Sequence, residues 1–271
     1  MPSLRSSEPI AGYTVKERVG AGGYGEVWTA EVPGGLVKAI KFVYGYLDDD
    51  RASRELKALN RIKQVRHPFL LSIERIEVVD GQLMIVTELA EMSLKDRFEQ
   101  CRAERLPGIP REELLIYLGD AADALDFMRV SHSLQHLDVK PENLLLLGGR
   151  VKVADFGLVK DIGVTEASLM GGMTPVYAPP EVFDDRPGEY SDQYSLAIVY
   201  QEMLTGVLPF PGKTAAQLAT QHLQSPPRLA SLPPHDRAVI ERALSKVSNH
   251  RFPSCRELID LLIVAPKARA A

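Results

Sequence analysis

Alternation of apolar and polar positions in the first third of the chain predicts a small sheet. Residues 13–43 contain short strand-like runs, and two more runs follow at 70–79 and 82–89. The last two flank Asp80–Gly81, a dipeptide that strongly favours a two-residue hairpin between antiparallel strands. Residues 51–62 instead carry apolar side chains at helical spacing. This part of the chain should therefore form an antiparallel sheet with one helix.

Beyond residue 89 the apolar positions recur mainly at helical spacing. Segments 112–128 and 192–204 predict two long helices, the second apolar on most of its faces. Segments 214–217 and 254–257 have the Ser/Thr-x-x-Glu/Gln pattern that opens helices. Gly148–Gly149 separates two short apolar runs and predicts one more tight hairpin. The larger, C-terminal part should be mainly helical.

Composition places the chain among ordinary globular proteins. The 271 residues are 45% hydrophobic and 25% charged, with a formal net charge of −4. That charge gives no electrostatic argument for binding nucleic acid or an anionic membrane. Two cysteines, Cys101 and Cys255, make no disulfide framework or metal motif, so we expect a reducing cytoplasm. We find no membrane-spanning run and no signal-peptide core.

Five short motifs give the chemistry. In chain order they are Gly20-Ala-Gly-Gly-Tyr-Gly25, Ala39-Ile-Lys41, His136-Leu-Asp-Val-Lys-Pro-Glu-Asn143, Asp155-Phe-Gly157 and Ala178-Pro-Pro-Glu181. The set and its order closely resemble the motifs of the protein-kinase family, from about residue 13 to about residue 262. One position departs from the family pattern: Leu137 stands where His-Arg-Asp has arginine, as in kinases called non-RD.

The resemblance implies an α+β fold with two lobes. A small antiparallel-sheet N-lobe with one main helix would span about 13–89. A larger, mainly helical C-lobe would span about 90–264, with an ATP cleft between the lobes. We expect residues 1–12 to be an N-terminal tail and 265–271 a C-terminal tail or linker. The chain could then be the cytoplasmic domain of a longer, membrane-anchored kinase.

The glycine motif suits phosphate binding because glycine lets backbone N–H groups approach an anion closely. A dinucleotide-binding loop would need a helix directly after the glycines, whereas residues 26–32 continue as a strand. Ala39 and Lys41 lie two apart on a strand and so share a face. By resemblance Ala39 packs on adenine, Lys41 orients the phosphates, and Glu55 is the partner of Lys41. The nucleotide-binding residues implied by the family are Val19, Gly20, Gly22, Gly25, Val27, Ala39, Lys41, Glu88, Ala90 and Leu145.

The segment 136–143 would carry the reaction. Asp138 resembles the aspartate that accepts the substrate hydroxyl proton, and Lys140 resembles the lysine beside the transferred phosphoryl group. Asn143 and Asp155 resemble the metal ligands, for which Mg²⁺, with Mn²⁺ as an alternative, is the expected ion. The sequence Lys-Pro-Glu after the aspartate favours Ser/Thr over Tyr specificity.

Three further positions resemble structural parts of the family. The loop 174–181 resembles the substrate-binding loop of Ser/Thr kinases, and its Glu181 should pair with a buried Arg251. Asp192 resembles the aspartate that holds the catalytic loop. Because Leu137 removes a cation that would grip a phosphorylated loop, phosphorylation of Thr165 or Ser168 should not be an obligatory switch.

We therefore expect a Ser/Thr protein kinase that transfers the γ-phosphoryl group of Mg·ATP to protein hydroxyls and can phosphorylate itself. Its partners would be protein substrates with Ser/Thr acceptors. We expect no nucleic-acid partner, and the oligomeric state stays open. The alternatives are a pseudokinase that binds nucleotide or partners without chemistry, favoured only by Leu137, and a small-molecule phosphotransferase, which the substrate loop and Arg251 disfavour.

Overall fold

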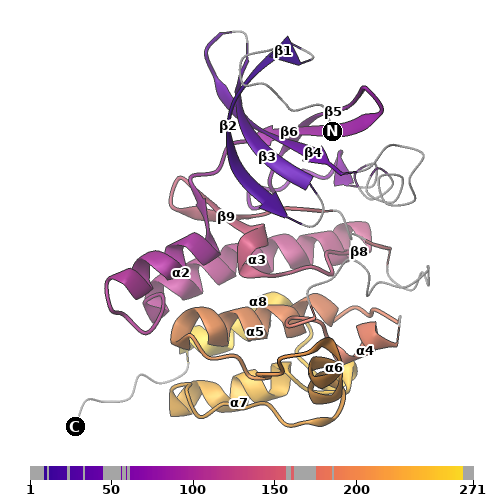
Figure 1. Cartoon of the computed structure of the whole chain (residues 1–271). Helices are drawn as coiled ribbons and strands as arrows, with labels where there is room; N and C mark the ends of the chain where they lie inside the picture. Colours follow the sequence, from indigo (N-terminus) through magenta and orange to yellow (C-terminus); the bar gives the residue numbers. More distant parts are fainter. Residues whose placement is uncertain are drawn as a thin grey trace. The chain divides into compact units, whose positions relative to one another are not determined.

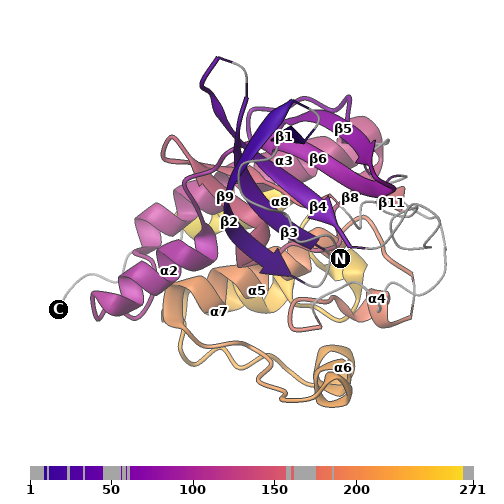
Figure 2. The ribbon, with the colours of Figure 1, turned by 45° about the horizontal axis from the view of Figure 1, so that its top comes forward.

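The structure is a computed structural model that describes residues 9–10, 12–22, 25–32, 34–44, 56, 59, 62–156, 160–161, 175–184 and 186–264. The chain divides into two compact units (Figures 1 and 2). The N-terminal unit comprises residues 1–66 and 71–91, and the C-terminal unit comprises 67–70 and 92–271. The expected domain limits of 13–264 stay a prediction.

An antiparallel sheet forms the N-terminal unit. Its six strands follow the spatial order β1-β2-β3-β4-β6-β5. They are β1 Pro9–Ile10, β2 Tyr13–Gly22, β3 Gly25–Glu31, β4 Val37–Val43, β5 Ile73–Val79 and β6 Gln82–Glu88. One sheet face carries the core of this unit, in which the buried side chains include Val15, Ile40, Phe42 and Met84. The antiparallel sheet predicted from the alternation is confirmed.

Local backbone geometry explains two details of this sheet. Asp80 and Gly81 both have positive φ angles, 50° and 78°, as a two-residue hairpin with matching twist requires. That predicted hairpin is confirmed. Pro9–Ile10, in contrast, was placed in an N-terminal tail, but these residues pair with Tyr13–Thr14 as β1. Gly12, at φ 88°, makes the turn that folds β1 back onto β2.

The predicted helix at 51–62 falls mostly outside the described residues. Of its positions, Leu56, Leu59 and Ile62 have helical backbone, and Leu59 and Ile62 are buried.

Helices dominate the C-terminal unit, as predicted. They are α2 Leu94–Ala103, α3 Arg111–His132, α4 Pro180–Phe183, α5 Ser191–Thr205, α6 Ala215–Gln224, α7 Pro234–Ala243 and α8 Cys255–Val264. The short strands are β7 Met92–Ser93, β8 Leu134–Gln135, β9 Leu144–Leu147, β10 Arg150–Val153 and β11 Lys160–Asp161, and the 3₁₀ turns include η1 Pro141–Asn143 and η3 Ser248–His250. Helix α5 is buried along residues 191–201, in accord with its apolar pattern.

Helix starts and the second hairpin follow the sequence signals. The Thr214 hydroxyl accepts from Gln217 N at 3.2 Å, and the Ser254 hydroxyl accepts from Glu257 N at 2.9 Å. Each bond satisfies a backbone donor that a helix start leaves without an intrahelical partner. Gly148–Gly149 adopts positive φ angles of 61° and 73° between β9 and β10. These predictions are confirmed.

Helix α2 was missing from the sequence interpretation. Its capping box is complete: Asp96 N donates to the Ser93 hydroxyl, and Ser93 N donates to the Asp96 carboxylate. The signal, Ser93 followed three residues later by Asp96, was present in the sequence but was not recognised.

Both cysteines lie in the C-terminal unit. Cys101 and Cys255 are buried and unpaired, and burial raises the pKa of both thiols. Among the described residues, no helix combines the length and the apolar composition needed to cross a membrane.

Candidate functional site

A buried carboxylate at the start of α5 fixes the backbone of the loop that follows β8. Asp192 accepts from His136 N and from Leu137 N, both at 2.8 Å, and each bond uses a different carboxylate oxygen. Carboxylates that accept backbone N–H bonds make strong, charge-assisted contacts. Burial raises the pKa of Asp192, while the nearby His136 and the two N–H donors lower it. The geometry confirms the expectation that Asp192 holds this loop.

His136 links the loop to the strand pair β9–β10. Its ring is fully buried, and Nε2 lies 2.9 Å from Ala154 O. Its Nδ1 accepts from Asp138 N at 3.3 Å, and its ring contacts Phe156 edge-on at a centroid distance of 5.6 Å. Both ring nitrogens therefore serve the fold.

Three predicted catalytic residues meet at one carboxylate. Lys140 Nζ lies 2.6 Å from Asp138 Oδ2, and Asn143 Nδ2 donates to the same oxygen at 3.0 Å. Asn143 Nδ2 also donates to Asp138 O at 2.8 Å. The turn η1 sets this arrangement, because it brings position 143 back toward position 138. Among the described residues, Asp138 Oδ1 has no hydrogen-bond partner.

Asp155 is close enough to act on Asp138 electrostatically. The pKa of Asp138 is raised, first by burial and in smaller part by the charge of Asp155, while Lys140 lowers it. Asp155 itself is half-buried and has φ 63°, a left-handed conformation that non-glycine residues seldom adopt. Leu137 shares this conformation, also at φ 63°. Such strain often accompanies functional loops.

The donor set at this position fits a hard divalent cation. Asn143 Nδ2 donates both of its hydrogen bonds to Asp138, so the carboxamide oxygen of Asn143 is not used in these contacts. Ala154 N donates to the Asn143 backbone oxygen at 2.8 Å, which brings the next residue, Asp155, close to Asn143. Carboxylate and carboxamide oxygens are ligands that Mg²⁺ prefers. No cluster of three or more His, Cys, Asp or Glu side chains suited to a metal occurs in the described part of the chain. The fit therefore rests on this one carboxylate and one carboxamide.

Two glycines of the first motif have different structural reasons. A Cβ atom at Gly20 would meet nothing within 4 Å, whereas one at Gly25 would lie 2.1 Å from Phe42 O. Gly25 is thus required for the close approach of β3 to β4. Gly20 and Gly22 lie on β2 and Gly25 begins β3, so all three belong to one hairpin. Open space makes Gly20 the stronger candidate for contact with a phosphate.

The other predicted nucleotide residues are distributed over both units. In the N-terminal unit, Lys41 on β4 is opposite Val27 on β3, and Ala39, 8% exposed, shares the strand face of Lys41. Val19 on β2 is 53% exposed. Glu88 ends β6, where its side chain accepts from Ser72 N at 2.9 Å, and Ala90 follows. Leu145 lies on β9 of the C-terminal unit, while Glu55 and Gly157 lie outside the described residues.

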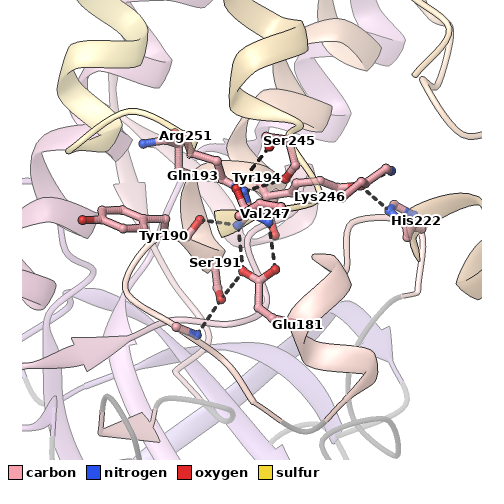
Figure 3. Close-up of polar contacts among 12 residues, drawn as sticks. Glu181, Tyr190, Ser191, Gln193, Tyr194, His222, Ser245, Lys246, Val247 and Arg251 are labelled. Atoms are coloured by element: carbon pink, nitrogen blue, oxygen red, sulfur yellow. Dashed lines mark hydrogen bonds and ion pairs between the residues drawn. The ribbon is translucent and has the colours of Figure 1, made fainter. Parts of the chain in front are cut away.

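The end of the predicted substrate loop is held by an ion pair (Figure 3). Arg251 donates to both oxygens of Glu181, at 2.7 and 2.8 Å, and its side chain is fully buried. Ser191 adds a third contact to Glu181 at 2.8 Å, and Arg251 also donates to Tyr190 O at 2.9 Å. The predicted pair is confirmed, with its arginine buried and its glutamate side chain 15% exposed.

Helix α5 holds the same loop through residues that the sequence interpretation missed. Ser195 donates to Tyr177 O at 2.8 Å, and the Tyr177 hydroxyl donates to Glu202 at 2.7 Å. Positions 192, 195 and 202 lie on one face of α5 by helical spacing. Polar residues on one face of an otherwise apolar helix were the signal that could have identified them.

Leu137 has a packing role. It is 1% exposed and forms a small core with Ala178 and Val182, against which Phe183 also packs. The sequence interpretation treated this leucine only as the loss of a cation. In the structure it is also an apolar contact between the catalytic loop and the segment that ends in α4.

Comparison with known proteins agrees with this geometry. The family model described as protein kinase domain matches residues 13–270. The serine/threonine-protein kinase PknF of Mycobacterium tuberculosis is 28% identical over 93% of this chain and 56% of its own length. PknJ of the same organism is 30% identical over 94% of this chain and 45% of its own length. The chain thus spans about half the length of the curated relatives it matches.

A solved structure has the same fold. The PknI kinase domain of Mycobacterium tuberculosis superposes with a TM-score of 0.73 at 27% identity, over 97% of this chain and 100% of that domain. The expected protein-kinase fold is therefore confirmed. With the family match over nearly the whole sequence, this establishes that the chain belongs to the protein kinase domain family.

Proposed function

We propose that the chain is an active Ser/Thr protein kinase domain that transfers the γ-phosphoryl group of ATP to protein hydroxyls. The observation that carries the proposal is the meeting of Asp138, Lys140 and Asn143 on one carboxylate oxygen, with Asp138 Oδ1 left without a hydrogen bond among the described residues. The serine/threonine-kinase names of the relatives support the choice of acceptor.

Asp138 would act on the hydroxyl of the substrate. As that oxygen attacks the γ-phosphorus of ATP, its proton passes to Asp138, the bond from the γ-phosphorus to the bridging oxygen breaks, and ADP leaves. Lys140, 2.6 Å from Asp138, would place its positive charge beside the transferred group. Lys41 would orient the nucleotide phosphates, with Glu55 as its partner.

The residues for nucleotide and metal follow from the same proposal. Asn143 and Asp155 would hold the divalent cation, Mg²⁺ or Mn²⁺, which when bound neutralises charge on the phosphates. Val19, Gly20, Gly22, Gly25, Val27, Ala39, Lys41, Glu88, Ala90 and Leu145 would contact ATP. Gly25 would contact ATP through its backbone, and its lack of a side chain is already required by the close approach of Phe42 O.

The substrate would bind at the loop that ends in α4, which supports a protein acceptor over a small molecule. An ion pair between Glu181 and Arg251 and a hydrogen bond from the Tyr177 hydroxyl hold this loop in place. The pseudokinase alternative is disfavoured by the intact Asp138–Lys140–Asn143 arrangement. Cytoplasmic location, and membership of a longer membrane-anchored protein, stay predictions.

One assay tests the proposal. The purified chain is incubated with radiolabelled ATP and Mg²⁺, with dephosphorylated casein as acceptor, and the labelled amino acids are identified after hydrolysis. We expect phosphoserine and phosphothreonine on casein and on the chain itself, and no label with Asp155→Asn. Label that persists at wild-type level in Asp155→Asn, or label on tyrosine alone, would contradict the proposal.

A further inference from the structure

One lysine, which has no carboxylate partner among the described residues, lies near Tyr194 and His222 (Figure 3). Lys246, between α7 and η3, is half-buried, and its Nζ donates to Gln221 O at 3.2 Å and to the Tyr194 hydroxyl at 3.4 Å. The same nitrogen lies 4.1 Å from the centroid of the Phe210 ring. Within the described part of the chain, no carboxylate forms an ion pair with it.

The hydrogen bonds from Lys246 have a defined direction. An ammonium group can only donate, so the Tyr194 oxygen accepts from it and the Tyr194 hydroxyl hydrogen is left for the next acceptor. That acceptor is His222 Nδ1, 3.0 Å away. His222 is completely buried, and burial, followed by the charge of Lys246, lowers its pKa to about 3. The imidazole is therefore neutral, and its one proton must lie on Nε2.

The resulting Nε2–H group lies near the backbone of the predicted substrate loop. Nε2 is buried and makes no hydrogen bond of ordinary geometry with the described residues. The backbone of Val176 is nevertheless close enough to act on this ring, in the direction that raises its pKa. A buried donor without a partner is costly. A loop position that brings the Val176 carbonyl onto Nε2–H is therefore favoured.

Aromatic contacts hold the His222 ring in this orientation. The ring stacks on Phe183 of α4 at a centroid distance of 5.8 Å and lies 4.6 Å from Phe210. Helix α6 thus presents His222 between the end of the substrate loop and Tyr194 of α5.

We propose that Lys246 is a positioning residue for the substrate-binding loop. Through Tyr194 it fixes the tautomer of His222, whose Nε2–H then holds the backbone carbonyl of Val176. The inference rests on the proposed function, since it concerns the loop to which we assign binding of the protein substrate.

Loss of the charge on Lys246 should weaken this arrangement. A neutral amine can accept a hydrogen bond, so the Tyr194 hydroxyl can turn toward it and His222 Nδ1 can become the donor. The proton then leaves Nε2, and two lone pairs face each other at Val176. Burial, and in smaller part Arg251, lowers the pKa of Lys246 to about 8. The other charged or titratable groups around it are Tyr194, the neutral His222, and Glu181 paired with Arg251. The fraction of His222 that carries its proton on Nε2 should thus fall as pH rises through 8.

Steady-state kinetics with casein and Mg·ATP test this inference. We expect Lys246→Gln and His222→Asn to raise KM for casein about threefold to tenfold, the effect of one neutral hydrogen bond, with kcat and the KM for ATP within about twofold. The glutamine carboxamide oxygen can accept from the Tyr194 hydroxyl, as a neutral lysine can. Lys246→Arg keeps a donor-only cation, and His222→Gln keeps an N–H near the position of Nε2. Both should therefore stay within about twofold of the wild-type KM. Lys213→Gln, at an exposed lysine before α6, is the matched control.

A purely structural role would not give the same pH dependence. The wild-type KM for casein should rise between pH 7 and 9, while Lys246→Gln should show a KM that is already high and does not change. An unchanged KM in Lys246→Gln, or a wild-type pH dependence in that variant, would overturn the inference.

A measurement that needs no activity separates this inference from the proposed function. In the full chain labelled with ¹⁵N-histidine, the His222 resonances at pH 7 should report the Nε2–H tautomer, and Lys246→Gln should report a mixture. If casein is never phosphorylated, the proposed function fails, and the tautomer measurement still decides the role of Lys246. A pure Nε2–H tautomer in Lys246→Gln would reject that role.

Discussion

Asp138 and Glu181, two carboxylates of the C-terminal unit, differ in how many of their oxygens accept hydrogen bonds from surrounding residues. Both contacts to the Asp138 side chain, from Lys140 and Asn143, fall on Oδ2. At Glu181, Arg251 takes both oxygens and Ser191 adds a third contact. Among the described residues, the first arrangement leaves one oxygen without a hydrogen bond, and the second leaves none. We infer that the number of occupied oxygens separates the carboxylate proposed for catalysis from the one that supports the structure.

The largest expected effect is catalytic and lies at Asp138. Asp138→Asn keeps the shape and the contacts of Oδ2 but removes the basic oxygen, so kcat should fall roughly 10²–10⁴-fold. The melting temperature should change by no more than about 4 °C. Casein phosphorylation and thermal unfolding are the two measurements. Asp184→Asn, the same change at an exposed carboxylate, is the control, and equal activity of the two variants would refute the comparison.

The next effect is on stability and lies at the ion pair. Arg251→Ala leaves Glu181, whose side chain is 15% exposed, without its cation, which should cost about 3–5 kcal/mol of unfolding free energy. Urea unfolding of this variant and of Arg251→Lys gives the values, with Arg228→Ala as an exposed-arginine control. An Arg251→Ala variant as stable as Arg228→Ala would show that the occupied carboxylate does not support the fold.

Leu137 allows the same comparison for an apolar contact, because it packs against Ala178 and Val182 without any charge. Leu137→Ala would leave a cavity beside Ala178 and Val182 and should cost about 2–5 kcal/mol. Urea unfolding measures the loss. Leu137→Met, which keeps the volume, should lose less than about 1.5 kcal/mol. Equal stability of the alanine variant and the wild type would mean that this small core contributes nothing.

A smaller effect concerns the pH dependence of the open carboxylate. Burial raises the pKa of Asp138, so the acid limb of kcat/KM against pH should lie above the usual range of an aspartate. Lys140 lowers this pKa, and Lys140→Met should therefore move the limb to higher pH. An acid limb that stays in place, or moves to lower pH, would show that the limb reports another group.

The smallest effect on activity is expected at Thr165 and Ser168, which lie between Asp138 and Glu181 in the sequence. Thr165 and Ser168 lie outside the described residues, and Leu137 offers no cation to a phosphate placed there. The double variant Thr165→Ala/Ser168→Ala should keep kcat/KM within about tenfold of wild type, or about 1.4 kcal/mol. A hundredfold loss in the double variant, matched by wild type treated with a phosphatase, would show that the loop is gripped in another way.

How much of the fold the sequence could predict depended on the range of the interactions. Asp80–Gly81 and Gly148–Gly149 were predictable because a two-residue hairpin selects its residues locally. Pairing of Pro9–Ile10 with β2 was missed, since a two-residue strand carries too little alternation to be recognised. Helix α2 carried a local signal at Ser93 and Asp96 that was not recognised.

The candidate site divides in the same way. Glu181–Arg251 and Asp192 could be predicted because the family pattern specifies them, and the geometry confirms both. The packing of Leu137 on Ala178 and Val182 could not be predicted, since the partners are far apart in the chain and no periodic pattern joins them. For Lys246, His222 and Val176 the same reason applies, because their relation depends on the packing of separate elements.

The sequence distance between anchor and loop sets an order of events during synthesis. His136 must wait for Asp192, 56 residues later, which at about 5–20 residues per second takes roughly 3–11 s. Glu181 must wait 70 residues for Arg251, or roughly 4–14 s. In a nascent chain, Asp192 can therefore bond to the backbone of His136 and Leu137 before Arg251 has been synthesised to pair with Glu181. In that interval the unpaired Glu181 carboxylate stays in water, because burying it alone would be costly.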